Sequence, residues 1–160
     1  MTVTALFTAK LEVTEQITVG VPDAIAAQSN IVHNVWNISD LTLTPTTRTS
    51  SFVATLVAGA LTVDLRALTG YGGYAIDGVG LRVQGIFIQA LATNAAVVTI
   101  AIGASNGYDG FGSTFAVTLK AGGVALISTL DNGSDIAAGK KTLDLSGTGT
   151  DAVNIQLVMG

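Results

Sequence analysis

Hydrophobic and polar residues alternate with a period of two along much of the chain, which is the pattern of β-strands that bury one face. Residues 11–21 show it clearly, because their apolar positions of one parity are Leu11, Val13, Ile17, Val19 and Val21. Glu15 interrupts this apolar parity, so we expect a bulge or the end of a buried stretch there. Pro22 and Asp23 then end the pattern.

Short strands and glycine-rich turns account for most of the sequence. Predicted strands include residues 2–8, 11–21, 31–38, 41–44, 52–56, 61–65, 81–91, 96–102, 115–119, 124–129, 143–145 and 153–159. Single helical turns are expected at 24–28 and 66–69, and tight turns at 58–59, 77–78 and 120–123, with positive φ at the Asp77-Gly78 pair. We predict an all-β chain: a single-domain antiparallel β-sandwich over residues 1–160, jelly-roll-like, with about nine or ten short strands.

Composition favours a protein that works in an assembly. The 160 residues are 11% charged, against roughly 25% in typical proteins. A surface of Thr, Ser, Asn, Gln and Gly offers contact area with few charges to desolvate. The net charge is −4 and no basic stripe exists, so we expect no nucleic-acid partner.

A long uncharged stretch raises the question of a membrane span. Residues 83–108 contain no charged side chain, but they include several amides and hydroxyls and alternate with period two. We therefore predict two strands joined near residues 92–95, and no membrane partner.

Motifs that resemble catalytic or ligand-binding sequences lack their necessary partners. Ser105 stands in a literal G-x-S-x-G (103–107), yet the lone histidine, His33, lies upstream, and glycines follow where a helix is needed. Residues 131–135 are interpreted as an Asx-rich turn rather than a calcium loop, and Lys140-Lys141 as a turn with two solvated lysines. We expect no enzymatic activity, no cofactor and no metal; a small serine hydrolase is the least favoured reading.

Aromatic residues in glycine-rich loops are the candidate contact residues. They are Tyr71, Tyr74, Tyr108 and Phe111, and Phe7 adds an aromatic residue in the first strand. Such residues anchor protein interfaces or stack on sugars. Equally, they can cap the ends of a sandwich core, and the sequence leaves both interpretations open.

Four segments resemble small structural proteins of tailed phages, in particular head decoration (cement) proteins. They are GASNGYDGFG (103–112), FAVTL (115–119), GGVALI (122–127) and GKKTLDLSGTGTD (139–151), and the resemblance covers about residues 61–160. It implies a jelly-roll-like sandwich, typically a homotrimer, that binds the major capsid protein on the outside of the virion.

On that interpretation, residues 1–10 form an N-terminal arm or an exchanged strand. Val3, Leu6 and Phe7 are then candidate subunit or capsid contacts, together with the loop aromatics. The alternative is a tail, fibre or baseplate module that binds a host-surface carbohydrate through Tyr71, Tyr74, Tyr108 and Phe111.

Overall fold

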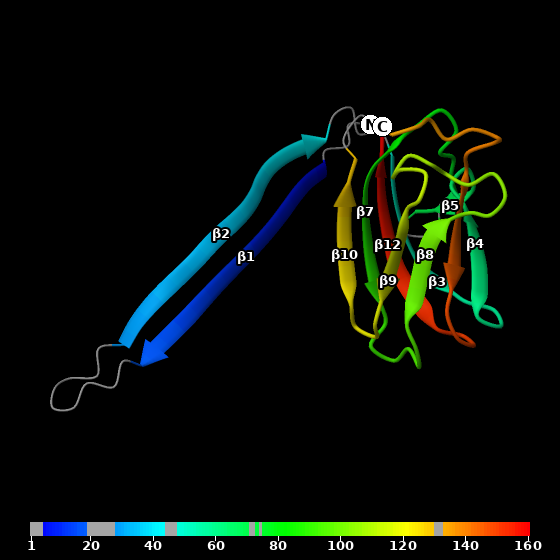
Figure 1. The fold of residues 1–160 in the computed structure, drawn as a ribbon. Coiled ribbons are helices and arrows are strands. Elements are labelled where there is room, and N and C mark those ends of the chain that lie inside the picture. Colours follow the sequence, from blue (N-terminus) through cyan, green and yellow to red (C-terminus); the bar gives the residue numbers. More distant parts are fainter. Residues whose placement is uncertain (1–4, 19–27, 44–47, 71–72, 74, 130–132) are drawn as a thin grey trace, which may run out of the picture. The chain divides into compact units, whose positions relative to one another are not determined.

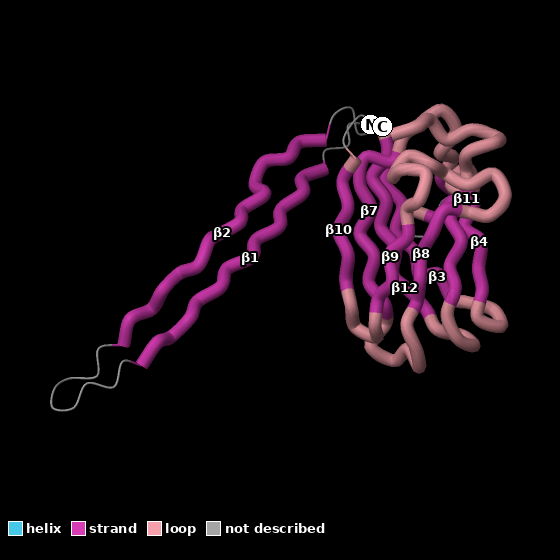
Figure 2. The backbone as a smooth tube through the Cα atoms, viewed as in Figure 1, coloured by secondary structure: helices cyan, strands magenta, loops and turns pink. Residues whose placement is uncertain are grey.

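The computed structural model describes residues 5–18, 28–43, 48–70, 73, 75–129 and 133–160, and it contains only strands, turns and loops there (Figures 1 and 2). The strands are β1 (Ala5–Thr18), β2 (Gln28–Leu43), β3 (Arg48–Thr55), β4 (Ala60–Asp64), β5 (Leu68–Thr69), β6 (Ala75–Ile76), β7 (Val83–Ala90), β8 (Val98–Ile102), β9 (Ala116–Leu119), β10 (Val124–Ser128), β11 (Thr142–Ser146) and β12 (Ala152–Met159). The all-β prediction is confirmed. No helix in this part of the chain has the length and apolar character needed to cross a membrane.

Strands β3 to β12 form a β-sandwich of two four-stranded sheets, ordered β10-β7-β12-β3 and β4-β11-β8-β9. The short β5 and β6 pair with each other beside them. The eight strands of the two sheets pair in a nested order: β3 with β12, β4 with β11, β7 with β10, and β8 with β9. All four pairs are antiparallel, and in chain order the outermost strands pair with each other and the innermost strands pair with each other. This nesting is the jelly-roll topology, so the predicted fold class is confirmed.

Alternation along the strands builds the sandwich core. In β12, Val153, Ile155, Leu157 and Met159 are buried while the residues between them are more exposed. The facing sheet contributes, among others, Val98, Ile100, Leu143 and Leu145. Both sheets therefore cover each other's apolar face, as the period-two pattern predicted.

Strands β1 and β2 form a separate two-stranded antiparallel sheet. The chain divides into two compact units, and Ala5–Leu43 make up one of them. This differs from the expected single sandwich domain of residues 1–160, in which only residues 1–10 formed an arm. The physical reason is that β1 and β2 satisfy their ladder with each other, whereas the nested sandwich sheets are built from the strands after residue 47.

Strand β2 contains two bulges, and because of them most apolar residues of β1 and β2 stay on the same face of the hairpin. Paired positions share a face, and one face contains the pairs Ala5–Leu43, Phe7–Leu41, Ala9–Ile38, Leu11–Trp36, Val13–His33, Glu15–Ile31 and Ile17–Ser29. The apolar parity of β2 changes twice, and a bulge accompanies each change. The predicted breaks at 9–10 and 39–40 are therefore wrong: β1 and β2 run through both, because a bulge absorbs a parity change without ending a strand.

Turn predictions are partly confirmed. Ala58 and Gly59 have φ values of 52° and 84°, as a two-residue hairpin turn requires, and the chain also turns at 120–123. At the Asp77-Gly78 pair the positive φ was misplaced, because it belongs to Gly80 (74°). Gly78 is needed for space: a Cβ there would lie 2.3 Å from the carbonyl oxygen of Leu65.

The predicted helical turn at 66–69 is also wrong, because Leu68–Thr69 form β5 and pair with β6. Of the helical turn predicted at 24–28, residues 24–27 lie outside the described residues, and Gln28 begins β2.

Candidate interaction surfaces

The outer face of the sheet β10-β7-β12-β3 is a surface without charge. Its positions follow from the strand register in three rows of four. The rows are Val124–Gln89–Asn154–Val53, Leu126–Phe87–Gln156–Ser51 and Ser128–Gly85–Val158–Thr49. We call these positions the neutral face. None of them is Asp, Glu, Lys or Arg, although the described chain contains charged residues of both signs elsewhere.

Large apolar side chains are exposed on the neutral face. Val53 and Val124 are each 58% exposed and Leu126 is 41% exposed, and they are three of the six large hydrophobic residues that are exposed among the described residues. Between the two valines, the Asn154 side-chain amide donates to Gln89 Oε1 (3.2 Å). A surface of apolar groups and paired amides, depleted of charge, has the composition found at the centre of protein–protein interfaces.

The outer face of the second sheet is different in its chemistry. Asp144 lies on it, where one carboxylate oxygen accepts from Thr62 Oγ1 (2.6 Å) and the other from the backbone N–H of Ala104 (2.7 Å). The hydroxyls of Thr99 and Thr118 bond each other (2.8 Å). This face satisfies its polar groups internally and carries charge, so it is the less suitable of the two for docking.

Tyr108 lies in the core and not on a contact surface. Its side chain is fully buried (0% exposed), its hydroxyl donates to Ser134 O (2.8 Å), and it accepts from the Val83 N–H (2.9 Å). Burial raises the pKa of Tyr108. Since the ring has no exposed surface in the sandwich, Tyr108 is unavailable as a subunit, capsid or sugar contact in this conformation.

Phe111 belongs to the same aromatic cluster. Its ring meets Tyr108 edge-on at 5.6 Å and packs on Phe115 at 4.7 Å, centroid to centroid. It is half-buried against the core. The interpretation that loop aromatics cap the end of the sandwich is therefore the one that fits Tyr108 and Phe111.

The other predicted contact residues are divided between strand β1 and segments outside the described residues. Val3, Tyr71 and Tyr74 fall outside the described residues. Leu6 and Phe7 are in β1, where Leu6 pairs with Thr42 and Phe7 with Leu41. They therefore belong to opposite faces of the hairpin, and Phe7 is on the face that collects most of the apolar positions.

Ser105 of the G-x-S-x-G motif lies in an exposed turn after β8. The hydrogen bond described for its hydroxyl is a long one from the Asn106 side chain (3.4 Å), and Asn106 has a positive φ of 55°. His33 is in β2. The turn continues into a loop and not into the helix that follows the serine in a nucleophile elbow.

The two adjacent lysines form ion pairs, which corrects the prediction of two solvated side chains. Lys140 Nζ lies 2.8 Å from Asp109 Oδ2, and this lysine lowers the pKa of Asp109. Lys141 Nζ, in a side chain only 19% exposed, lies 3.0 Å from Asp64 Oδ2. These pairs connect the loop before β11 to the β8–β9 loop and to the end of β4.

Asp64 is the most strongly perturbed carboxylate. Hydrogen bonds from the Arg66 guanidinium hold the pKa of Asp64 far below its usual range, and Lys141 adds to this effect. The carboxylate also accepts from the backbone N–H of Arg66. The contacts among Asp64, Arg66 and Lys141 stabilise the turn between β4 and β5, so this cluster has a structural role.

Metal-binding side chains do not gather in the described residues: no group of three or more His, Cys, Asp or Glu is found there. Asp131 and Asn132 of the Asx-rich turn lie outside these residues. Asp135 instead accepts a hydrogen bond from Arg82 Nε (2.6 Å).

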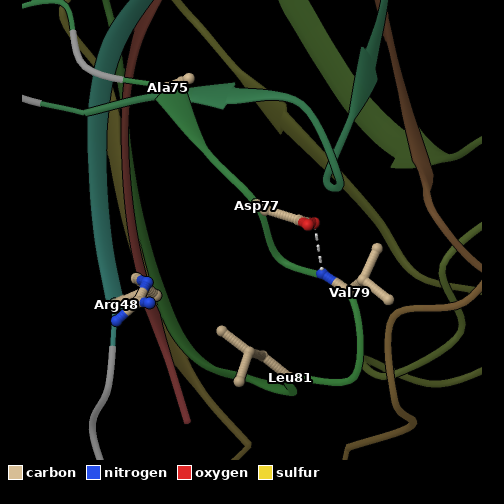
Figure 3. Close-up of a pocket in the computed structure, with 5 residues that line it drawn as sticks. All are labelled: Arg48, Ala75, Asp77, Val79 and Leu81. Carbon is tan, nitrogen blue, oxygen red and sulfur yellow. Dashed lines mark hydrogen bonds between the residues drawn. The ribbon is translucent and has the colours of Figure 1, made fainter.

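A shallow groove of about 550 Å³ is lined by Arg48, Ala75, Asp77, Val79 and Leu81 (Figure 3). Asp77 accepts from the Val79 N–H (2.9 Å), which folds the loop back on itself. The groove offers one cationic and one anionic side chain on a wide opening, and these do not form a catalytic arrangement.

Sequence comparisons add no family: no protein-family model matches the chain, and no curated protein matches it either.

The neutral face was not predicted as a site, although signals for it exist in the sequence. Three charge-free stretches, 83–108, 121–130 and 152–160, contain β7, β10 and β12. In these stretches the positions of both parities are uncharged, including those that face outward. This was the signal in the sequence that could have indicated an uncharged surface. Only the nested topology shows that these strands are neighbours in one sheet.

Proposed function

We propose that this protein is a non-enzymatic virion structural protein, a capsid decoration (cement) protein that binds the major capsid protein from outside and stabilises the shell. The observation that carries the proposal is the hairpin Ala5–Leu43. Isolated two-stranded sheets are marginally stable in water and need further strands or a packing partner. The hairpin has strands of 14 and 16 residues, which is long enough to contact a neighbouring protein.

The composition of the hairpin supports a protein partner. One face of its ladder collects Phe7, Leu11, Trp36 and Ile38, among other apolar positions, whereas the opposite face is mainly polar. An amphipathic two-stranded sheet of this kind buries its apolar face against another protein, or extends another sheet through a strand edge. The expected N-terminal arm thus becomes a hairpin arm, in which Leu6 and Phe7 remain candidate contacts.

Binding to a capsid shell allows many weak contacts to act together. A protein that binds the assembled shell and not its free subunits stabilises the shell by mass action. Symmetric association, with a homotrimer as the favoured form, multiplies the contacts of each copy. The carbohydrate-binding alternative is less well supported, because Tyr108 is buried and Phe111 packs against it.

The test is co-sedimentation with empty shells of the major capsid protein from the same genome. We expect wild-type protein to sediment with shells, and deletion of residues 1–8 to weaken binding by about tenfold or more, equal to about 1.4 kcal/mol. Ser146→Ala, on the outer face of the second sheet, is the matched control and should bind normally. Absence of wild-type binding at micromolar concentration contradicts the proposed function, whereas unchanged binding of the deletion contradicts only the role of the arm.

The solution mass provides an independent check of the assembly. Light scattering on a size-exclusion column should give about three times the 16.1 kDa of one chain for a homotrimer.

A further inference from the structure

Strand β10 is an open edge of the sandwich. It pairs with β7 on one side, and no described strand pairs with its other side. The N–H of Thr129 donates to Gln84 O, and the N–H of Ala90 to Gly123 O. Because ladder bonds alternate along a strand, Ala125 and Ile127 also bond toward β7, and Val124, Leu126 and Ser128 present their N–H and C=O groups to the open edge.

This edge lacks the charge that protects the others. Natural sheets block edge pairing with charged residues, proline or bulges. Strand β3 contains Arg48, β4 contains Asp64, and β9 ends immediately before Lys120. Residues 121–130 contain no charged residue and no proline, and β10 pairs with β7 without a register shift.

The same three edge residues continue the neutral face. Val124 (58% exposed) and Leu126 (41% exposed) stand beside Gln89 and Phe87 of β7. Any strand added at this edge therefore places its own side chains next to an exposed apolar row that carries no charge.

We propose that β10 is a self-association edge, at which a second copy of this chain pairs its own β10 antiparallel to the first. The two-fold axis passes Leu126, so that Leu126 of one copy lies opposite Leu126 of the other, and Val124 lies opposite Ser128. All three pairs use backbone groups that face the open edge, and each pair exchanges two hydrogen bonds.

A second copy fits this edge because the contact is self-complementary. A two-fold contact brings each residue near its own counterpart or a close neighbour, so charged edges repel their own copies. Here the facing residues are uncharged, whereas the whole chain has a net charge of −4 that opposes association through its acidic surfaces. The two neutral faces then join into one continuous eight-stranded surface, four strands from each copy.

The contact is small and therefore reversible. A pair of five-residue strands buries less than the roughly 1,000 Å² of a stable interface. It concerns two copies of this chain and does not depend on the proposed capsid role, although on a shell it would join neighbouring oligomers.

Cross-linking of single cysteines tests the pairing, because the chain has no cysteine of its own. Leu126→Cys should cross-link with a short bismaleimide at millimolar protein concentration about tenfold faster than Ser146→Cys, since pairing raises the effective concentration of the two thiols. Residue 146 is likewise an exposed strand position, but it belongs to the outer face of the other sheet. Equal rates for the two variants would overturn the proposal.

A charge swap tests the register. Adding Val124→Glu and Ser128→Glu to the Leu126→Cys chain should reduce cross-linking to the Ser146→Cys rate, because each glutamate then lies opposite a glutamate of the other copy. Replacing Val124→Glu by Val124→Lys in that chain should restore it, because each new lysine then lies opposite a new glutamate of the other copy. Circular dichroism and thermal unfolding verify that the variants fold. Failure of the restoration in folded protein contradicts the Leu126-centred register.

Co-sedimentation with shells is measured separately, so the loss of this contact and the loss of the proposed function are distinguishable.

Discussion

The sandwich and the hairpin are built from the same alternating pattern but complete it differently. In the sandwich, the apolar side of β12 meets a second sheet, and Ile155 and Leu157 are each 1% exposed. The hairpin has the same alternation over Phe7, Ala9 and Leu11, but among the described residues its sheet consists of two strands, β1 and β2. The difference teaches that alternation specifies a face to be buried, while the number and nesting of strands decide whether the chain buries it within one sheet pair.

The single tryptophan allows the two regions to be observed separately. Trp36 is in β2, so its fluorescence reports on the hairpin, whereas far-ultraviolet circular dichroism sums over the strands of both units, most of which belong to the sandwich. Two compact units predict two transitions that do not coincide in denaturant. The substitutions below are expected to move the sandwich transition and leave the tryptophan transition in place.

The largest effect is expected for Ile155→Ala, at the centre of the sandwich core. The substitution removes buried methylene and methyl groups and leaves a cavity, so the free energy of unfolding should fall by about 2–5 kcal/mol. The matched control Val53→Ala, on the exposed neutral face of β3, should change it by less than about 0.5 kcal/mol. Denaturant titration followed by circular dichroism measures both, and a parallel shift of the tryptophan signal would show that the two units unfold together.

An intermediate effect is expected for Tyr108→Phe. The ring is kept, but the buried N–H of Val83 and the carbonyl of Ser134 each lose the hydroxyl partner. Leaving buried polar groups unsatisfied costs about 1–3 kcal/mol of unfolding free energy. Phe115→Leu, in the same cluster but without a hydrogen bond to lose, is the comparison. A cost for Tyr108→Phe no larger than zero would mean that water replaces the hydroxyl.

The smallest effect is expected for Asp64→Asn, and it should depend on pH. The pKa of Asp64 is lowered in the folded protein by Arg66 and Lys141, so its ionised form stabilises the fold above the unfolded pKa of about 3.9. That contribution is lost as the pH falls below about 4 toward the folded value. Because the carboxylate is about one-third exposed, we expect about 1 kcal/mol at pH 7. Unfolding curves of both proteins should converge in acid; a constant difference would contradict this explanation.

Much of the fold could be predicted because short strands and their faces are local properties. Parity along residues 81–91 and 115–119 identified β7 and β9 to within a few residues. Glycine residues located the turns at 58–59 and 120–123. Prediction failed where a local signal has two meanings: the parity changes in β2 resemble strand ends, and only pairing with β1 shows that they are bulges.

The candidate site was harder to predict than the fold. Loop aromatics suggested a contact surface, yet Tyr108 is in the core, because its hydroxyl finds buried partners from segments 25 and 26 residues away in the chain. Likewise, Lys141 appeared solvated in the sequence, and its partner Asp64 comes from a strand 77 residues earlier. Side chains of mixed character take the environment that distant segments provide.

By itself, the sequence determined that this chain forms an all-β sandwich with little surface charge. Alternation and turn residues act locally along the chain, and the low charge is a property of the total composition. Only the tertiary structure decided that β10, β7, β12 and β3 lie in one sheet, and that their uncharged positions gather on one face beside an open edge. The physical reason is that hydrogen-bonded ladders join strands far apart in the chain. Which strands become neighbours depends on the nesting of the whole jelly roll and not on any one strand.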